Sequence, residues 1–531
     1  METVSLDGLN LDIDAVVAVA RGGARVELDP EAIRRVKAAE EFVARLVREE
    51  RVVYGITTGF GKFSEVVISR EEVTHLQRNL ILSHATGVGP ALPEDTVRAV
   101  MLLRANALAR GHSGIRLVTL ERLLEMINRR VHPLVPAKGS VGASGDLAPL
   151  AHIALVLIGE GEAFYQGEWL TGGEAMRRAG LEPVVLEAKE GLALINGTQV
   201  MAGIGALAVH DAAMLLKAAD IAGAMSLEAL KGTMTAFAMA IQKVRPHPGQ
   251  QAVSANFHLL TRGSEIIESH KNCPKVQDAY SLRCIPQVHG ASRDALDYVR
   301  EVIITEMNSV TDNPLIFLGE DWPVADTDGP DAGGGPINPD LGGAVVSGGN
   351  FHGQPVAIAM DFLGIALSEI ASIAERRVER MLNPQLSGLP AFLAEKGGLN
   401  SGLMISQYTA AALVSENKVL ASPASVDSIP TSANQEDHVS MGTIAARKAA
   451  EILDNVRNVL AIELLCASQG LDFQKPLLPG EGTGKAYEVI RAGVPHLEND
   501  RVIYSDINKV YRLIADEVLV SEVEKAVGKL V

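Results

Sequence analysis

The sequence predicts a mainly α protein built around a long antiparallel helical bundle, with a smaller N-terminal region that carries a glycine-rich loop. Apolar residues recur at three- and four-residue spacing through residues 97–130 and 358–381, which is the period of an amphipathic helix. Residues 210–230 and 441–468 are rich in alanine and leucine and predict two further long helices. Alternating strand patterns are few and short, and the sequence has no internal repeat. Helices of about 30 residues would each be about 45 Å long, a length typical of a bundle.

The helix predicted over residues 358–381 has two distinct faces. The face expected to point into the core consists of Leu363, Leu367, Ile370 and Ala374. The opposite, polar face consists of Asp361, Ser368, Ser372, Glu375 and Glu379. Such a division predicts a helix with one buried side.

Composition along the chain predicts three consecutive segments. These are an N-terminal loop-bearing domain, a central helical bundle and a C-terminal helical cap, at residues 1–200, 201–480 and 481–531. Residues 318–346 are dense in proline and glycine and predict a flexible insertion in the central segment. Asp326 and Asp328 hint at calcium there, but the spaced ligands and closing glutamate of a calcium loop are missing, which favours a solvated loop.

Composition also limits the possible partners and compartment. The 531 residues have a formal net charge of -17, which argues against a nucleic-acid surface or an anionic membrane partner. The three cysteines form no paired pattern, as expected in a reducing cytoplasm. The first residues contain no basic-then-apolar segment, so no signal peptide is expected. The uncharged stretch 191–209 is interrupted by glycines and amides, so a buried segment is favoured over a membrane span.

The most informative short motif is Gly-Ala-Ser-Gly-Asp at residues 142–146. Small residues flank Ser144, so the backbone can bend tightly enough for the amide nitrogen of Gly145 to attack the carbonyl carbon of Ala143. Loss of two waters, one of which takes the Ser144 hydroxyl, would leave a 4-methylideneimidazol-5-one ring (MIO). This ring is a strong electrophile made from protein alone, with no external cofactor. The tripeptide also occurs in ordinary turns, so its surroundings must decide.

Two other glycine-loop chemistries fail on spacing. A nucleophile elbow needs a glycine two positions after its serine, but Asp146 stands there. A phosphate loop needs its first glycine five positions before a Gly-Lys pair and a hydroxyl residue directly after it. The chain has Ile56 and Phe63 at those positions around Gly61-Lys62.

Seven blocks in the same order resemble the aromatic amino acid ammonia-lyase and aminomutase family. They are YGITTGFG, RNLILSHATGVG, GSVGASGDLAPLAHI, INGTQ, QDAYSLRCIPQVHGA, SGGNFHG and TSANQEDHVSMG, which begin at residues 54, 78, 139, 195, 277, 347 and 431. The last three blocks resemble the histidine-specific branch of the family. The resemblance implies a helical bundle of the fumarase and aspartase type, and a carbon–nitrogen lyase that converts L-histidine to urocanate and ammonia. It also implies a cytoplasmic homotetramer with active sites shared between subunits, in which stripes such as 363–374 would pack across subunits.

The resemblance implies which residues do the chemistry. Asn196 would activate the carbonyl oxygen of the electrophile, in the manner of an oxyanion hole. Tyr54 would be the base, and its pKa near 10 when unperturbed requires a positive neighbour or the field of the electrophile. Tyr280 and Glu436 complete the expected catalytic set, together with Ala143, Ser144 and Gly145.

The expected substrate contacts divide by the part of the substrate they recognise. Arg283 suits the carboxylate because its guanidinium binds in a planar, bidentate way, and Gln277 and Tyr280 stand close before it in the sequence. His84 and Glu436 suit the imidazole, since a carboxylate would be costly against a phenyl ring. Met404 would form an apolar wall, and Phe351 would lie beside the electrophile. No metal site is expected; His289, His352 and His438 are interpreted as hydrogen-bonded structural residues.

Three alternatives remain for comparison. The first is a tyrosine or phenylalanine lyase or aminomutase on the same scaffold, against which Glu436 argues. The second is an inactive scaffold, against which the intact tripeptide with Tyr54 and Asn196 argues. The third is the fumarase and argininosuccinate lyase group, whose SSxMPxKxN loop is missing from this sequence.

Overall fold

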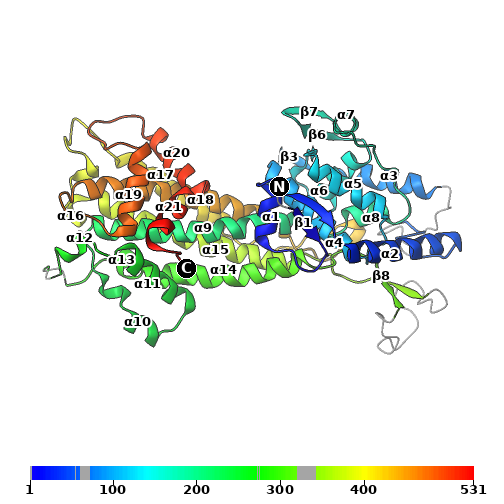
Figure 1. The fold of residues 1–531 in the computed structure, drawn as a ribbon, viewed down its shortest axis with the longest axis horizontal. Helices are drawn as coiled ribbons and strands as arrows, with labels where there is room; N and C mark the ends of the chain where they lie inside the picture. Colours follow the sequence, from blue (N-terminus) through cyan, green and yellow to red (C-terminus); the bar gives the residue numbers. More distant parts are fainter. Residues whose placement is uncertain (1–2, 54, 60–71, 272, 274–275, 320–341) are drawn as a thin grey trace. The chain divides into compact units, whose positions relative to one another are not determined.

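A computed structural model describes residues 3–53, 55–59, 72–271, 273, 276–319 and 342–531. Figure 1 shows a mainly helical chain with a few short strands, which confirms the predicted fold class. Contacts divide the chain into two compact units that each combine distant parts of the sequence. The first unit consists of Met1–Leu207, Arg300–Met360 and Pro423–Arg447, and the second of Ala208–Val299, Asp361–Ser422 and Lys448–Val531. The expected division into three consecutive segments stays a prediction.

The first unit combines short helices with small two- and three-stranded sheets. Its helices are α1 Ile13–Ala20, α2 Pro30–Arg48, α3 Val73–His84, α4 Glu94–Ala109, α5 Leu117–Asn128, α6 Leu147–Leu157, α7 Gly172–Arg178 and α8 Glu190–Ile195. Its strands are β1 Thr3–Leu6, β2 Arg25–Leu28, β3 Val88–Ala91, β4 His132–Pro133, β5 Pro136–Lys138, β6 Glu162–Tyr165, β7 Glu168–Thr171, β8 Leu315–Leu318 and β9 Gly343–Val346. Strands β1 and β2 pair in parallel, and the other pairs are antiparallel.

The named elements among the described residues of the second unit are all helices, joined by turns and loops. Its own helices are α10 Met239–Val244, α11 Pro248–Leu260, α12 Glu265–Glu268, α13 Tyr280–Arg283, α16 Pro384–Ser387, α17 Met404–Leu420, α19 Glu481–Gly493, α20 Ile503–Ala515 and α21 Val518–Val527. The division between the units falls within the four longest helices, which are α9 Gln199–Ala229, α14 Ile285–Met307, α15 Gln354–Leu382 and α18 Gly442–Asp472.

The long-helix predictions are confirmed in three cases and corrected in one. Helices α9, α15 and α18 contain 31, 29 and 31 residues, close to the expected length. The pattern over 97–130 is instead divided between α4 and α5. Gly111 and Gly114 in the connection have φ of +81° and +70°, a left-handed backbone that ends a helix. The connecting residues 110–116 read RGHSGIR, so the two glycines marked the break although apolar spacing resumes in α5.

Helix α15 confirms its apolar stripe but corrects its polar face. Leu363, Leu367, Ile370 and Ala374 are all buried within the single chain, so this stripe is not what would pack across subunits. Two residues of the polar face, Asp361 and Glu375, are also buried. They stay satisfied because Lys448 donates to Asp361 at 3.2 Å and Gln407 donates to Glu375 at 3.2 Å. The apolar side chains that α15 leaves exposed are Ile358, Phe362 and Ile365.

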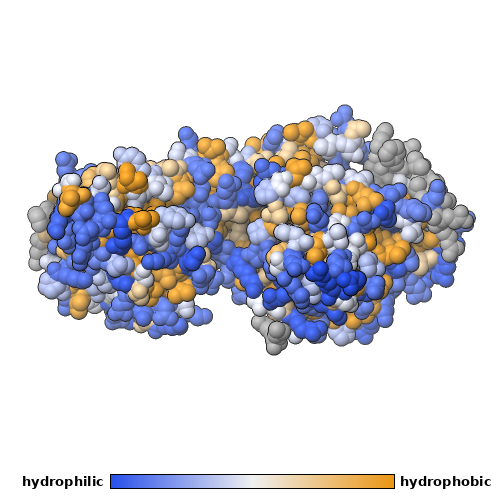
Figure 2. Space-filling view, turned by 90° about the horizontal axis from the view of Figure 1, so that it is seen from above, coloured by the Kyte–Doolittle hydropathy of each residue, from blue (hydrophilic) through white to orange (hydrophobic). Residues whose placement is uncertain are grey.

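Helices α9 and α15 are long and apolar enough to cross a membrane by length and composition. In each, most of the apolar window is buried inside the protein, namely 78% for α9 and 61% for α15. Such burial is typical of a core helix. The face seen in Figure 2 is largely hydrophilic, with hydrophobic residues reaching the surface in separate patches.

The last four residues of the predicted 318–346 insertion form strand β9, which pairs with β8 at the other end of the insertion. Residues 320–341, which include Asp326 and Asp328, lie outside the described residues.

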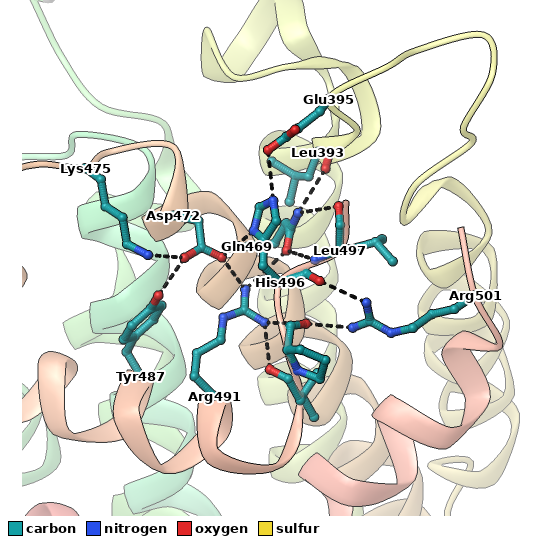
Figure 3. A network of polar contacts seen from close by, with 12 residues as sticks. Leu393, Glu395, Gln469, Asp472, Lys475, Tyr487, Arg491, His496, Leu497 and Arg501 are labelled. Atoms are coloured by element: carbon teal, nitrogen blue, oxygen red, sulfur yellow. Dashed lines mark hydrogen bonds and ion pairs between the residues drawn. The ribbon is translucent and has the colours of Figure 1, made fainter. Parts of the chain in front are cut away.

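A polar network in the second unit gathers around the Asp472 carboxylate at the end of α18 (Figure 3). It accepts hydrogen bonds from the hydroxyl of Tyr487 at 2.5 Å, from Arg491 at 2.7 Å and from Lys475 at 2.9 Å, and it pairs with His496 at 2.7 Å. Burial by itself raises the pKa of Asp472. The hydrogen bonds and the charge of Arg491 lower the pKa by a larger amount, so its value falls to about 2. The ionised carboxylate therefore ties α18 to α19 and to the segment after α19.

We predict that Asp472→Asn destabilises the protein more at neutral pH than at pH 3. A carboxyl group whose pKa is depressed on folding stabilises the folded state above its unfolded pKa of 3.8, and this contribution disappears as pH falls towards 2. The loss at pH 7 should be about 1–2 kcal/mol after allowance for solvent screening. Urea midpoints of the two proteins, compared at pH 7 and pH 3, measure it. An equal difference at both pH values would contradict the assignment.

Candidate active site

The loop at residues 139–146 is held in a tight bend. Gly142 and Gly145 have φ of +67° and +69°, a conformation that disfavours residues with a side chain. Gly145 forms a bridge with Gly197, and the amide of Asp146 donates to the Gly197 carbonyl at 2.7 Å. A Cβ atom at residue 145 would overlap this carbonyl, so only glycine fits. The small residues identified in the sequence therefore meet a real steric requirement.

The carboxylate of Asp146 is fully buried and fixes the end of this loop. It accepts from the backbone amides of Val200 at 3.0 Å and Met201 at 2.9 Å, in the first turn of α9. The hydroxyls of Ser140, at 2.9 Å, and Thr443 also donate to it. Burial raises the pKa of Asp146, and the hydrogen bonds from Thr443, Met201, Ser140 and Val200 oppose that shift.

A second segment, residues 439–443, lies against the same loop. Met441 donates its amide to the Val141 carbonyl at 2.9 Å, and the Ser440 hydroxyl donates to the Gly142 carbonyl at 3.0 Å. Ala143 packs in a buried cluster with Val439 and Met441. The bend is thus fixed from two sides by segments distant in sequence.

Asn196 follows α8 directly and is 2% exposed. Its side-chain amide donates to the Asn313 carbonyl at 2.9 Å, and its Oδ1 accepts no hydrogen bond from the described residues. Because the amide carries two N–H groups, one remains for another acceptor. A buried polar group with spare capacity beside Gly197 suits a site that receives a further polar group. The bend and this side chain fit the MIO ring.

His84 and Glu436 lie within electrostatic range of each other. Burial lowers the pKa of His84, while its hydrogen bond to the Leu80 carbonyl and the charge of Glu436 raise it. The bond from Nδ1 to Leu80, at 2.8 Å, places the proton on Nδ1 and leaves Nε2 as an acceptor. Glu436 is partly buried, and the Thr431 hydroxyl donates to its carboxylate at 2.7 Å. Nε2 of His84 and the carboxylate of Glu436 can therefore both accept hydrogen bonds from a polar ring.

Phe351 is half-buried in the segment before α15, and its neighbour His352 meets His438. The two imidazoles stack with centroids 5.5 Å apart, and Nε2 of His352 lies 3.2 Å from the His438 carbonyl. His289, in the second unit, pairs with Asp220 at 2.8 Å. The interpretation of these three histidines as hydrogen-bonded residues is confirmed.

Four expected site residues belong to the second unit. Tyr280 and Arg283 lie on α13, with the guanidinium carbon of Arg283 4.6 Å from the ring centre of Tyr280. Tyr280 is 72% exposed, Gln277 is exposed, and Met404 begins α17. Within one chain these residues are therefore in a different unit from residues 143–145, Asn196, His84, Phe351 and Glu436. Tyr54, the expected base, lies outside the described residues.

Sequence reasoning missed several residues that shape the site. Asp146 follows the tripeptide directly, and its buried carboxylate could have been suspected from that position. Arg104, Asn313 and Thr443 carry no motif signal, because their contacts with the site span 92 or more positions.

Comparisons with known proteins identify the family. The family model for aromatic amino acid lyases matches residues 11–492. A curated relative from Alkaliphilus oremlandii, named histidine ammonia-lyase, is 59% identical over 99% of both chains. The crystal structure of histidine ammonia-lyase from Trypanosoma cruzi has a TM-score of 0.88 at 43% identity and covers 99% of this chain and 96% of that chain. The tyrosine aminomutase of Streptomyces globisporus has a TM-score of 0.90 at 37% identity, covering 100% of both chains.

The chain belongs to the aromatic amino acid lyase family. It is an enzyme, a carbon–nitrogen lyase, and its substrate is a free amino acid.

We predict that Gly197→Ala damages the site while a matched glycine change elsewhere is tolerated. Gly197 has φ of +154°, and a Cβ there would overlap Arg104 Nη1 and Gln199 Oε1 and lie 2.8 Å from Thr311 Oγ1. Gly167 also has a positive φ, of +89°, but nothing lies within 4 Å of its Cβ position. Gly167→Ala should cost about 1 kcal/mol, and Gly197→Ala about 3 kcal/mol or more. Calorimetric midpoints measure the difference; equal losses in the two variants would refute the steric argument.

Proposed function

We propose that the protein eliminates ammonia from L-histidine to give trans-urocanate, the first step of histidine degradation, in the cytoplasm. The observation that carries this proposal is the proximity of Glu436 to His84, because a partly buried carboxylate and an imidazole acceptor suit a polar ring and oppose a phenyl ring. The names of the full-length relatives support the same substrate.

The reaction needs an electrophile, and residues 143–145 supply the parts for one. An MIO ring formed from Ala143-Ser144-Gly145 would offer a carbon to which the substrate amine adds, which makes ammonia a better leaving group. Asn196 has a free N–H that would donate to the ring carbonyl oxygen and would stabilise negative charge there. Tyr54 removes the β-proton, and Tyr280 assists that transfer.

The substrate is held at both ends. Arg283, with Gln277, binds the carboxylate, while His84 and Glu436 bind the imidazole. Phe351 and Met404 supply apolar walls. Glu436 also stands where it can move a proton near the reacting carbons, so it joins the catalytic set.

The division of these residues between two units supports an assembly with shared active sites. Gln277, Tyr280, Arg283 and Met404 belong to one unit and the electrophile to the other, and Tyr280 is largely exposed. A homotetramer in which active sites are shared between subunits would bring the two sets together. The exposed apolar residues of α15, Ile358, Phe362 and Ile365, recur on one helical face and suit such an interface.

One alternative has an observation in its favour. Tyrosine aminomutase from Streptomyces globisporus shares the whole fold at 37% identity, so a tyrosine lyase or aminomutase on this scaffold must be tested directly. Glu436 disfavours it, and measurements on substrates and products separate the two.

Ring formation predicts a specific mass. Intact wild-type protein should weigh two waters less than its encoded chain, because cyclisation and loss of the Ser144 hydroxyl each release one. Ser144→Ala should restore one of those waters and abolish nearly all turnover. A full encoded mass in active wild-type protein would refute the ring.

The assembly is tested by light scattering at the concentration of the activity assay. We expect the mass of a tetramer. Phe362→Glu, which places a charge in the exposed face of α15, should weaken assembly and turnover together. A fully active monomer would contradict the shared site.

Substrate choice is tested with Glu436→Gln and His84→Ala. Loss of a charged partner in a buried site costs about 2–4 kcal/mol, so Glu436→Gln should lower histidine turnover roughly thirty- to a thousandfold. If Glu436 binds the ring, both variants lose their preference for histidine over tyrosine and phenylalanine. If Glu436 is instead purely catalytic, its variant loses turnover equally on every substrate. Near-normal histidine turnover by Glu436→Gln would remove the main support for the proposal.

A further inference from the structure

Arg104, on α4, is a fully buried arginine whose guanidinium holds the segment that carries Asn196. Its Nη1 donates to the Asn196 carbonyl and to Gln199 Oε1, both at 2.8 Å. Its Nη2 donates to the Ala193 carbonyl at 2.5 Å. One side chain thus fixes three acceptors, two of them before Gly197 in the sequence and one after it. The planar guanidinium allows this because its donors diverge at fixed angles.

The charge of Arg104 is not neutralised by a direct ion pair among the described residues. The nearest anion that acts on it, Asp312, is paired with the buried Lys189 at 2.8 Å. Two buried cations therefore share one carboxylate. Burial lowers the pKa of Arg104 to about 10, and the charge of Asp312 opposes that shift. At neutral pH the guanidinium remains charged, so a net positive charge lies directly behind Asn196.

Asp312, which pairs with Lys189, also helps to hold the side chain of Asn196 through Asn313. Asp312 Oδ1 accepts the amide of Asn313 at 2.7 Å, and the Asn313 carbonyl accepts the side-chain amide of Asn196 at 2.9 Å. Asn196 is therefore fixed at its backbone by Arg104 and at its side chain by Asn313. Because both contacts are made, the orientation of its remaining N–H group is determined before substrate arrives.

We propose that Arg104 is a positioning residue for the elimination: it orients Asn196 towards residues 143–145 and places positive charge behind that amide. The inference rests on the proposed function, since it assigns to Arg104 the task of setting up the group that activates the electrophile. It predicts a defect in the chemical step with little change in substrate binding.

The chain supplies a matched control on the same helix. Arg98 is 3% exposed and also donates to three backbone carbonyls, those of Val19, Ala20 and Ile127, at 2.7–3.2 Å. Arg98→Lys and Arg104→Lys therefore remove the same kind of buried guanidinium contact and keep the positive charge. Arg104 lies near the candidate site, and Arg98 makes no described contact with Asn196.

The experiment compares the two variants with wild-type protein. For Arg104→Lys we expect kcat per ring-bearing subunit, counted by intact mass, to fall at least tenfold while KM stays within about threefold. We also expect slower uptake of cyanide, a small nucleophile, followed by intact mass without any turnover. Arg98→Lys should lower the thermal midpoint to a similar extent but leave kcat and cyanide uptake close to wild type.

Each outcome decides between the alternatives. Equal losses of kcat in the two variants, or unchanged cyanide uptake in Arg104→Lys, would overturn the positioning role. If Arg104→Lys does not fold, Gln199→Leu and Thr311→Val, which loosen the same contacts, replace it with the same expectations. Wild-type protein that fails to turn over histidine would instead refute the proposed function, whatever the variants do.

Discussion

The buried carboxylate of Asp146 is the constraint on which the rest of the first unit depends. It joins the reactive loop to the first turn of α9 and to the first turn of α18 through four hydrogen-bond donors. Removing a carboxylate from water is costly, but amides at a helix N-terminus and two hydroxyls compensate. Because these partners come from three separate parts of the chain, the loop can bend only when all of them have assembled. The shape of residues 142–146 is therefore a property of the folded unit and not of the tripeptide.

The same principle explains the surroundings of Asn196. Gly197 lets two backbones touch, Arg104 holds the carbonyl beside it, and Asn313 holds the side chain. These contacts use the backbone carbonyl and one side-chain N–H of Asn196, and they leave its second side-chain N–H available. A site prepared in this way needs little reorganisation when charge develops, which is how buried dipoles lower a reaction barrier.

Prediction from the sequence succeeded where the signal is local and failed where it is not. Apolar periodicity identified α9, α15 and α18, and small residues identified the loop at residues 139–146, because helical spacing and the absence of bulky side chains can be read from neighbouring residues. The break between α4 and α5 was missed because the apolar period of α4 resumes in α5, although Gly111 and Gly114 stand between them. The burial of Asp361 and Glu375 was missed because Lys448 and Gln407, their partners, are distant in sequence. Similarity to a family grouped Tyr280 and Arg283 with Asn196, but no sequence pattern indicates that they belong to different units.

The most direct test of the account is the reaction itself. Purified wild-type protein is given L-histidine, L-tyrosine and L-phenylalanine in turn, with urocanate followed by ultraviolet absorbance, ammonia by a coupled assay and amino acid products by chromatography. The account predicts urocanate and ammonia in equal amounts and a higher kcat/KM for histidine than for either other substrate. A β-amino acid product, or a higher kcat/KM for tyrosine, would contradict it.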